Sequence, residues 1–177
     1  ALMIRAAKGD RRAFEGIYDR YAGRLYNYFL KMLHQDEELA KDQTQELFMK
    51  LAEKGHQYDG KRAFKTYVFS IANNMCKNIY RSEEVKKRAN TELKIESETT
   101  ESQKMENIDR KAFKTALTEE LEKFDSERRS IFILRFKHQL SIKEIAETTG
   151  VAEGTVKSKL FYTLKKLSTQ LVSFNPK

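Results

Sequence analysis

Apolar side chains recur at intervals of three and four residues over most of the chain, and this periodicity constrains the fold more than any other feature. The first run consists of Phe14, Ile17, Tyr18, Tyr21, Leu25, Tyr28, Phe29 and Leu33. Such spacing places side chains on one face of an α-helix. Two further periodic stretches, at about 39–54 and 63–81, are separated by Gly55 and by Asp59-Gly60. We therefore expect three or four helices in the first part of the chain.

The stretch from 82 to 110 has a different character. It contains no aromatic residue and mixes Glu, Lys, Ser, Thr and Asn with a few scattered apolar residues. Such a composition is typical of a flexible linker. Periodicity returns at Phe113 and ends in a long segment at about 152–171. The sequence thus predicts an all-α protein of two small helical domains, at 1–81 and 111–177, joined by a flexible linker.

The composition also favours an all-α protein. The 177 residues include one Pro and seven Gly, fewer turn residues than strand-rich folds usually need. No apolar run approaches the roughly 18 residues of a membrane span, and the first residues lack a signal-peptide core. We therefore expect a soluble protein without an integral membrane segment. The single cysteine, Cys76, agrees with the reducing cytoplasm, where we expect the protein to act.

The net charge bears on the choice of partner. Lys and Arg number 34 against 26 Asp and Glu, a formal charge of +8. An excess of this kind favours a polyanionic partner such as nucleic acid or an acidic membrane surface. A solvated basic surface without a polyanionic partner is the alternative.

The segment 140–160 has the anatomy of a helix-turn-helix. Ser141 and Glu144 have the spacing of a capping box, which marks the start of a first helix. Gly150 suits a turn that requires a positive φ. An apolar stripe then continues along a second helix through Val151, Val156, Leu160, Leu164 and Leu167. An ordinary amphipathic hairpin with a basic side is the alternative.

The second helix of this motif leaves polar groups on its outer side. At 100° per residue, Thr155, Ser158, Tyr162 and Lys165 point away from the apolar stripe. From residue 152 to 177 there are five lysines and one acid, Glu153. Such a surface can contact base edges and phosphates in a major groove.

The two later helices of the first half present unlike surfaces. On the helix at 39–54, Asp42, Gln45, Glu46 and Met49 lie opposite the apolar stripe. Solvent exposure and contact with another protein explain this acidic face equally well. On the helix at 63–81, amides, hydroxyls and cations gather opposite the core face. They are Thr66, Ser70, Asn73, Asn74, Lys77 and Arg81. With Lys61 and Arg62, this side can bind an opened nucleic acid strand. Tyr67 and Tyr80 can stack on bases, although aromatic residues at helical spacing are more often part of a core.

Enzymatic functions find little support in the sequence. His34, His56, His138 and Cys76 lack the spacing of metal ligands, and no Gly-rich phosphate loop is present. We therefore expect neither a catalytic centre nor a bound metal or cofactor.

Together these segments resemble the bacterial sigma factors of the extracytoplasmic-function group, which consist of two helical domains and a short linker. The resemblance rests on four segments in the family's order. They are GDRRAF at 9–14, DQTQELF at 42–48, FKTYVFSIANN at 64–74 and GTVKSKL at 154–160. It implies a non-enzymatic protein that binds core RNA polymerase and directs transcription initiation at specific promoters. It also implies an anti-sigma factor as a partner, and no small-molecule substrate.

The resemblance further implies a role for individual residues. In the region 2 domain, at 1–81, polymerase binding falls to Asp42, Gln45, Glu46 and Met49. Recognition and melting of the −10 element fall to Lys61, Arg62, Tyr67, Asn73, Asn74, Lys77, Asn78 and Arg81. In the region 4 domain, at 111–177, recognition of the −35 element falls to Ser141, Glu153, Thr155, Lys157, Ser158, Lys159, Tyr162 and Lys165.

Some positions depart from the family pattern. Tyr67 stands where Trp is common, Asn73 where Arg or Val is frequent, and Lys157, Lys159 and Tyr162 where Arg is frequent. Lysine cannot make the two-pronged contact of arginine with guanine, so we expect the −35 contacts to rely more on phosphates. The rival interpretation is a two-domain helix-turn-helix regulator that binds operator DNA without polymerase. The promoter sequence and the inducing signal are left open.

Overall fold

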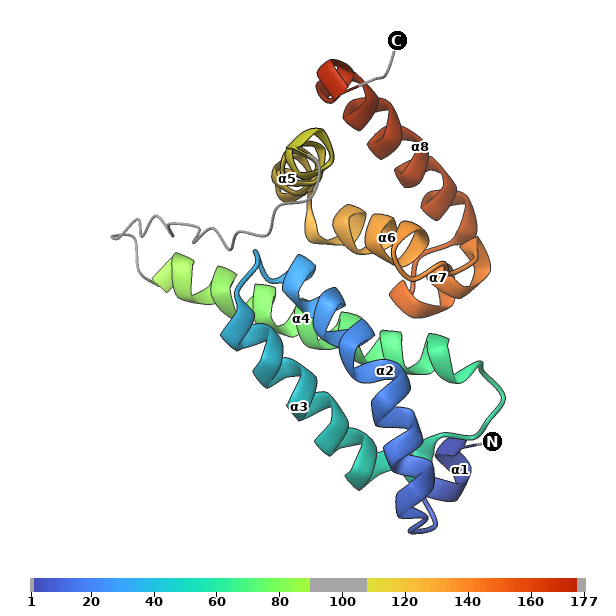
Figure 1. Cartoon of the computed structure of the whole chain (residues 1–177). Coiled ribbons are helices and arrows are strands. Elements are labelled where there is room, and N and C mark those ends of the chain that lie inside the picture. The colour runs from blue at the N-terminus through green and yellow to red at the C-terminus, as the bar shows by residue number, and fades with distance from the viewer. Residues whose placement is uncertain (1, 90–107, 175–177) are drawn as a thin grey trace.

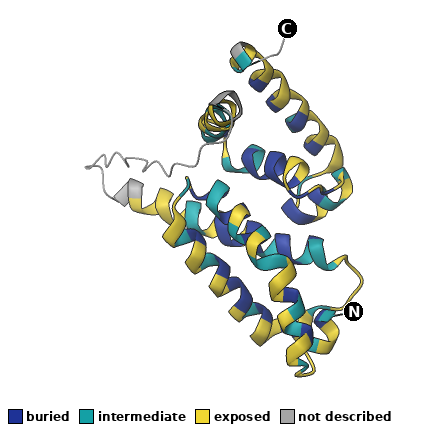
Figure 2. Cartoon of the chain, in the orientation of Figure 1, coloured by how far each residue is buried: buried dark blue, intermediate teal, exposed yellow. Residues whose placement is uncertain are grey.

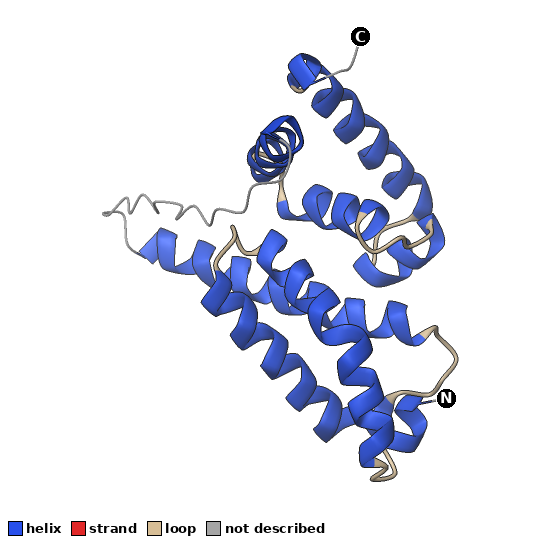
Figure 3. Cartoon of the chain, viewed as in Figure 1, coloured by secondary structure: helices blue, strands red, loops and turns tan. Residues whose placement is uncertain are grey.

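The computed structural model describes residues 2–89 and 108–174, and within them every regular element is a helix (Figure 3). The first unit contains α1 (Leu2–Ala6), α2 (Arg11–Met32), α3 (Glu37–Lys54), the 3-10 helix η1 (Gly55–Gln57) and α4 (Phe64–Ala89). The second unit contains α5 (Ile108–Glu122), α6 (Ser126–Phe136), α7 (Ile142–Thr149), α8 (Glu153–Gln170) and the 3-10 helix η2 (Val172–Phe174). The prediction of an all-α protein is confirmed.

In the first unit, α2 and α3 are antiparallel neighbours that pack with α4 around a shared core (Figure 1). The turn between α2 and α3 places His34 and Gln35 at positive φ, 54° and 63°. Asp36 then begins α3 by accepting a hydrogen bond of 2.9 Å from the backbone N–H of Leu39. The core is built from the apolar stripes that the periodicity predicts, with Leu25 and Leu47 fully buried.

The second unit contains the expected helix-turn-helix in α7 and α8. The Ser141 Oγ accepts a hydrogen bond of 3.2 Å from the N–H of Glu144, and the Glu144 carboxylate accepts one of 2.7 Å from the N–H of Ser141. Gly150 ends α7 with a φ of 75°. The capping box and the turn glycine are therefore both confirmed.

The apolar stripe of α8 differs from the prediction at one position. Val156, Leu160 and Leu167 are buried, but Leu164 is 44% exposed and Thr163 takes the buried place. A helical period of 3.6 residues brings position 163, and not 164, between 160 and 167 on the packed face. The expectation that Leu164 belongs to the stripe was wrong.

The two units pack against each other, with α7 lying along α4 and α6 close to α2 (Figure 1). Buried positions gather on the sides of α4, α6 and α7 that face one another (Figure 2). Tyr28 and Phe69 of the first unit share one buried cluster with Ile131, Leu134 and Ile145 of the second. We call this packing of α6 and α7 on α2 and α4 the closed arrangement.

The structure differs from the expected flexible linker, 82–110, at both ends of that segment. Helix α4 continues to Ala89 and α5 begins at Ile108, so both ends of the predicted linker are helical. Residues 82–89 have the sequence SEEVKKRA, in which Glu, Lys, Arg and Ala are strong helix formers. The low hydrophobicity of residues 82–89 therefore reflects an exposed end of α4 and not the end of the helix. The rest of the predicted linker, 90–107, lies outside the described residues. None of the helices in the described part of the chain is long and apolar enough to cross a membrane.

Candidate polymerase and nucleic-acid interfaces

The outer face of α3 is an acidic, amide-bearing surface with an apolar centre. Asp42, Gln45 and Glu46 are exposed, and Met49 is 62% exposed. The opposite side of the helix is buried in the first unit through Thr44, Leu47, Phe48 and Leu51. The Glu46 carboxylate accepts a hydrogen bond from Lys50 of the same helix. The four exposed residues Asp42, Gln45, Glu46 and Met49 lie on one face of α3, as the sequence predicts.

The side of α4 that was expected to meet the −10 element is only partly accessible. Asn74, Lys77, Asn78 and Arg81 are exposed. Lys61 and Arg62 are exposed in the loop before the helix. At 100° per residue, the four exposed residues of α4 lie on one side of the helix.

Tyr67 does not project freely from α4. Its ring lies 4.9 Å from the ring of Tyr58 and 6.2 Å from that of Phe64, measured between centroids. It is half-buried, and this burial raises the pKa of its hydroxyl. Packing within the first unit thus accounts for Tyr67. Tyr80 is packed as well: its hydroxyl donates to the carbonyl of Met32, and burial raises its pKa to about 12.

Asn73, which was expected to face nucleic acid, is not part of the free surface in the closed arrangement. Only 2% of the residue is exposed. Its Oδ1 accepts hydrogen bonds of 2.9 Å from Ser130 Oγ and 3.3 Å from the Tyr28 hydroxyl. Thr66, on the same side of α4, is also fully buried. Helix α4 has two covered faces because the second unit lies on it, and the periodicity of a single helix cannot reveal a second covering layer.

Cations of the first unit hold the second unit through its backbone. Lys77 Nζ donates to the carbonyl of Thr149 at 2.9 Å, at the end of α7. Lys65 Nζ donates to the carbonyl of Gln139 at 3.0 Å, and Arg24 to that of His138 at 3.4 Å. Part of the expected −10 surface is therefore engaged within the chain in the closed arrangement.

Arg129 of α6 makes a buried contact between the units that the sequence did not reveal. It is 4% exposed, and its guanidinium donates to the carbonyls of Leu121, Glu122 and Phe124 at 2.8 to 3.3 Å. It also donates across the interface to the carbonyl of Met32 at 3.2 Å. These oxygens lie at or just beyond the C-terminal ends of α5 and α2, where the helix dipole is negative. Backbone dipoles thus take the place of a carboxylate partner.

His138 is a second buried residue of this interface. Its ring centroid lies 4.5 Å from that of Phe69 and 5.9 Å from that of Tyr28. Burial and the nearby charges of Arg24, Lys65, Lys137 and Lys31 lower the pKa of His138 to about 4. The imidazole is therefore neutral at ordinary pH, and its pKa makes the closed arrangement sensitive to acid.

The outer side of α8 is open and basic. Glu153, Thr155, Lys157, Ser158 and Lys165 are exposed there, as expected for the −35 surface. Tyr162 is 60% exposed and Phe161, next to it, is 61% exposed. Two of the expected residues have structural partners. Ser141 caps α7, and Lys159 forms an ion pair of 3.1 Å with Glu127.

Comparison with known proteins places this architecture in a family. Residues 17–85 match the family described as Sigma-70 region 2, and residues 114–167 match Sigma-70, region 4. The RNA polymerase sigma factor YlaC of Bacillus subtilis is 30% identical over 152 residues, which cover 85% of this chain and 87% of YlaC. The ECF RNA polymerase sigma factor SigW of Bacillus subtilis is 27% identical over 176 residues, covering 93% and 91% of the two chains.

A solved structure has the same fold. It is the sigma factor RpoE in complex with the anti-sigma factor NepR from Bartonella quintana. Its TM-score is 0.75 at 20% identity, and the match covers 89% of this chain and 96% of RpoE. The chain belongs to the extracytoplasmic-function group of RNA polymerase sigma factors, which direct the polymerase to promoters for transcription initiation.

Proposed function

We propose that this sigma factor docks on core RNA polymerase through the outer face of α3, captures the opened −10 strand with α4 and reads the −35 element with α8. The observation that carries the proposal is the free face of α3. Asp42, Gln45, Glu46 and Met49 are exposed while the other side of the same helix is buried. Carboxylates and an amide around an exposed methionine suit a protein contact with a basic partner.

For the −10 element, the amide of Asn74 is accessible on α4 even in the closed arrangement, whereas that of Asn73 is bonded to Ser130 and Tyr28 and would lose Ser130 only when the units separate. We assign capture of an unstacked base to Asn74, with the neighbouring Asn78 as a second polar contact. Lys61, Arg62, Lys77 and Arg81 would hold the phosphates of the same strand. Among these cations, Lys77 would first have to leave the carbonyl of Thr149.

For the −35 element, α8 offers Thr155, Ser158 and Tyr162 to base edges and lysines to phosphates. Lys157 and Lys165 are exposed, whereas Lys159 would have to leave Glu127 to reach DNA. Because lysine contacts with phosphate carry no sequence information, we expect hydroxyl groups to supply much of the base selectivity here.

The closed arrangement belongs to the protein away from DNA. With α7 on α4, Lys77 is held by the carbonyl of Thr149, so the units would separate when α4 receives the promoter strand. RpoE, a structural relative, is bound to the anti-sigma factor NepR in its structure. We propose that an anti-sigma protein is likewise a partner of this chain, and that the chain acts in the cytoplasm, where core polymerase works.

The experiment is a competition for core polymerase. The variant Asp42→Lys/Glu46→Lys reverses two charges on the proposed docking face, and like charges across a desolvated interface cost several kcal/mol. We expect it to lose the competition with the unaltered protein by at least about 100-fold. The double change Glu119→Lys/Glu147→Lys, at exposed positions on α5 and α7, is the matched control and should compete normally.

Folding must be measured alongside binding. Because all four altered positions are exposed, both double variants should keep the helix content and a free energy of unfolding within about 1 kcal/mol of the unaltered protein. If the folded Asp42/Glu46 variant still competes normally, the outer face of α3 is not the docking surface.

A further inference from the structure

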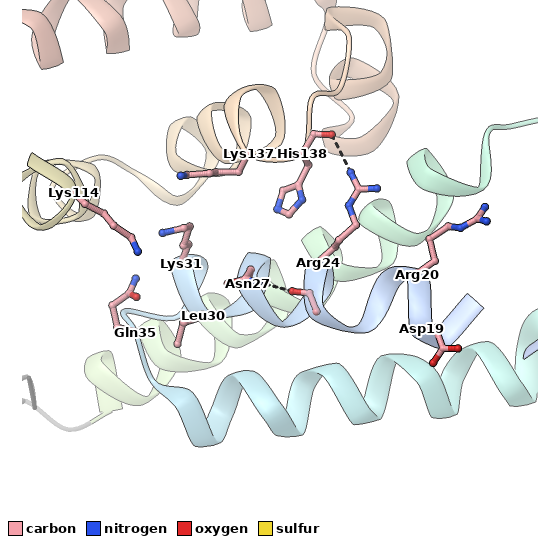
Figure 4. A pocket seen from close by; sticks show the side chains of 11 residues that line it. Asp19, Arg20, Arg24, Asn27, Leu30, Lys31, Gln35, Lys114, Lys137 and His138 are labelled. Carbon is pink, nitrogen blue, oxygen red and sulfur yellow. Dashed lines mark hydrogen bonds between the residues drawn. The ribbon is translucent and has the colours of Figure 1, made fainter. Parts of the chain in front are cut away.

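A cavity of about 510 Å³ lies between α2 and the second unit. Arg20, Arg24 and Lys31 of α2 line one side, and Lys114 of α5 and Lys137 at the end of α6 line the other (Figure 4). Its volume falls in the range of about 300–1,000 Å³ that is usual for small-molecule sites. Because both units contribute walls, the cavity exists only in the closed arrangement.

The charge around this cavity is strongly unbalanced. Asp19 is the acidic side chain among the described lining residues, and it lies at the Arg20 end, away from the three lysines (Figure 4). Among the described residues, none of the five lining cations forms an ion pair with a carboxylate. Burial and the charges of Lys137 and Lys114 lower the pKa of Lys31. Closing the units therefore brings like charges together at a cost that an anion would remove.

The donors are also arranged around a common space. The side chains of Lys31, Lys114 and Lys137 lie together, and the amide of Gln35 points to the same region (Figure 4). The Gln35 Nε2 atom is buried without a hydrogen-bond partner. Ammonium groups and amide N–H donors bind phosphate oxygens well. A single carboxylate would balance only one of these cations, whereas linked phosphates carry several negative charges on adjacent groups.

We propose that this cavity binds a small polyphosphate anion, either inorganic or the phosphate chain of a nucleotide, which bridges α2 to α5 and α6. The bound anion would favour the closed arrangement over separated units. Binding itself does not depend on the function proposed above. Its consequence for promoter access does rest on that function, because the closed arrangement covers part of α4.

The test is calorimetric titration of the full chain with pyrophosphate, tripolyphosphate, ATP and adenosine at constant ionic strength. We expect one pyrophosphate or tripolyphosphate per chain and no binding of adenosine. ATP that binds more tightly than tripolyphosphate would identify a nucleotide as the occupant, and equal affinity would identify an inorganic polyphosphate. Failure of all three phosphate compounds to bind, or binding of a glutamate-rich peptide in their place, would overturn the proposal.

Matched variants locate the site. The triple change Lys31→Gln/Lys114→Gln/Lys137→Gln should weaken pyrophosphate binding at least about tenfold, because it removes the charge-assisted hydrogen bonds from three ammonium groups to the phosphate oxygens. The control Lys41→Gln/Lys54→Gln/Lys143→Gln removes the same charge at exposed positions outside the cavity and should bind normally. Equal losses in the two variants would show diffuse attraction to a basic protein and would overturn the site.

A second readout reports the link to closure. Small-angle X-ray scattering should show that saturating pyrophosphate reduces the radius of gyration of the unaltered chain and of the control, but not of the cavity variant. Thermal melting without ligand should show the cavity variant folded and at least as stable as the unaltered chain, because it loses mutual repulsion. Bound pyrophosphate that leaves the radius of gyration unchanged or increases it would contradict the bridging role.

Discussion

Replacing Arg129 by Met tests the idea that backbone dipoles stabilise a buried cation between the two units. The guanidinium is 4% exposed and donates to four carbonyls. Two of these oxygens, of Leu121 and Met32, also accept from other donors, the N–H of Phe124 and the Tyr80 hydroxyl. Loss of Arg129 leaves each of these two oxygens with one hydrogen-bond donor, so the cost in stability should be small.

The other two oxygens, of Glu122 and Phe124, accept hydrogen bonds of 2.8 and 3.3 Å from Arg129. A buried acceptor left without its donor costs about 1–3 kcal/mol. Met fills much of the same space and removes the burial penalty of a charge, which offsets part of this loss. We therefore expect Arg129→Met to lower the free energy of unfolding by about 3 kcal/mol.

Urea unfolding followed by circular dichroism measures this change. Arg129→Lys is the informative companion, because it keeps the charge but cannot span carbonyls on both helices. Its free energy of unfolding should fall by about half as much, because one ammonium group can donate to fewer oxygens than the planar guanidinium of arginine. A loss below about 1 kcal/mol for Arg129→Met would refute the reasoning, because buried unpaired acceptors are expected to cost more than that.

Three further predictions follow from other side chains. Asn74→Ala should lower transcription from a double-stranded promoter and leave the affinity for core polymerase unchanged; parallel losses in both assays would contradict a role in base capture. His138 has a pKa of about 4 in the closed arrangement, and an ordinary histidine near 6.5 takes up a proton first in the unfolded chain. The contribution of His138 to the free energy of unfolding should be fully present above about pH 6.5 and should fall by about 2 kcal/mol by pH 5. Urea unfolding at the two pH values measures this loss, and the variant His138→Phe should not show it. Cys76 is 1% exposed and burial raises its pKa to about 12, so the folded chain should react with iodoacetamide far more slowly than the chain in urea; equal rates would show that the thiol is not covered.

Helix positions and the helix-turn-helix could be predicted from the sequence because local signals determine them. The capping box of Ser141 and Glu144 and the turn at Gly150 depend on residues close to one another in the chain. Likewise, the free face of α3 follows from the spacing around Leu47, since a single buried stripe determines which side remains exposed.

Contacts between the units could not be predicted in the same way. Asn73 appeared to lie on a polar, solvent-facing side of its helix, but its partner Ser130 is 57 residues away. Arg129 gave no signal at all, because its acceptors are main-chain oxygens that no sequence pattern displays. The polar side of α4 predicted a surface for a partner, and the structure shows that one such partner is the chain's own second unit.

The main-chain acceptors of Lys65, Lys77 and Arg24 have an evolutionary consequence. These cations hold the second unit by oxygens that every amino acid possesses, so these three hydrogen bonds do not depend on the chemical identity of the side chains at 138, 139 and 149. A recognition domain could therefore diverge toward a new promoter, or be exchanged for that of a relative, and still dock on its neighbour. Such a chimera would need to preserve the path of the backbone around α7, the side-chain match between Asn73 and Ser130, and the packing of position 138 against Tyr28 and Phe69.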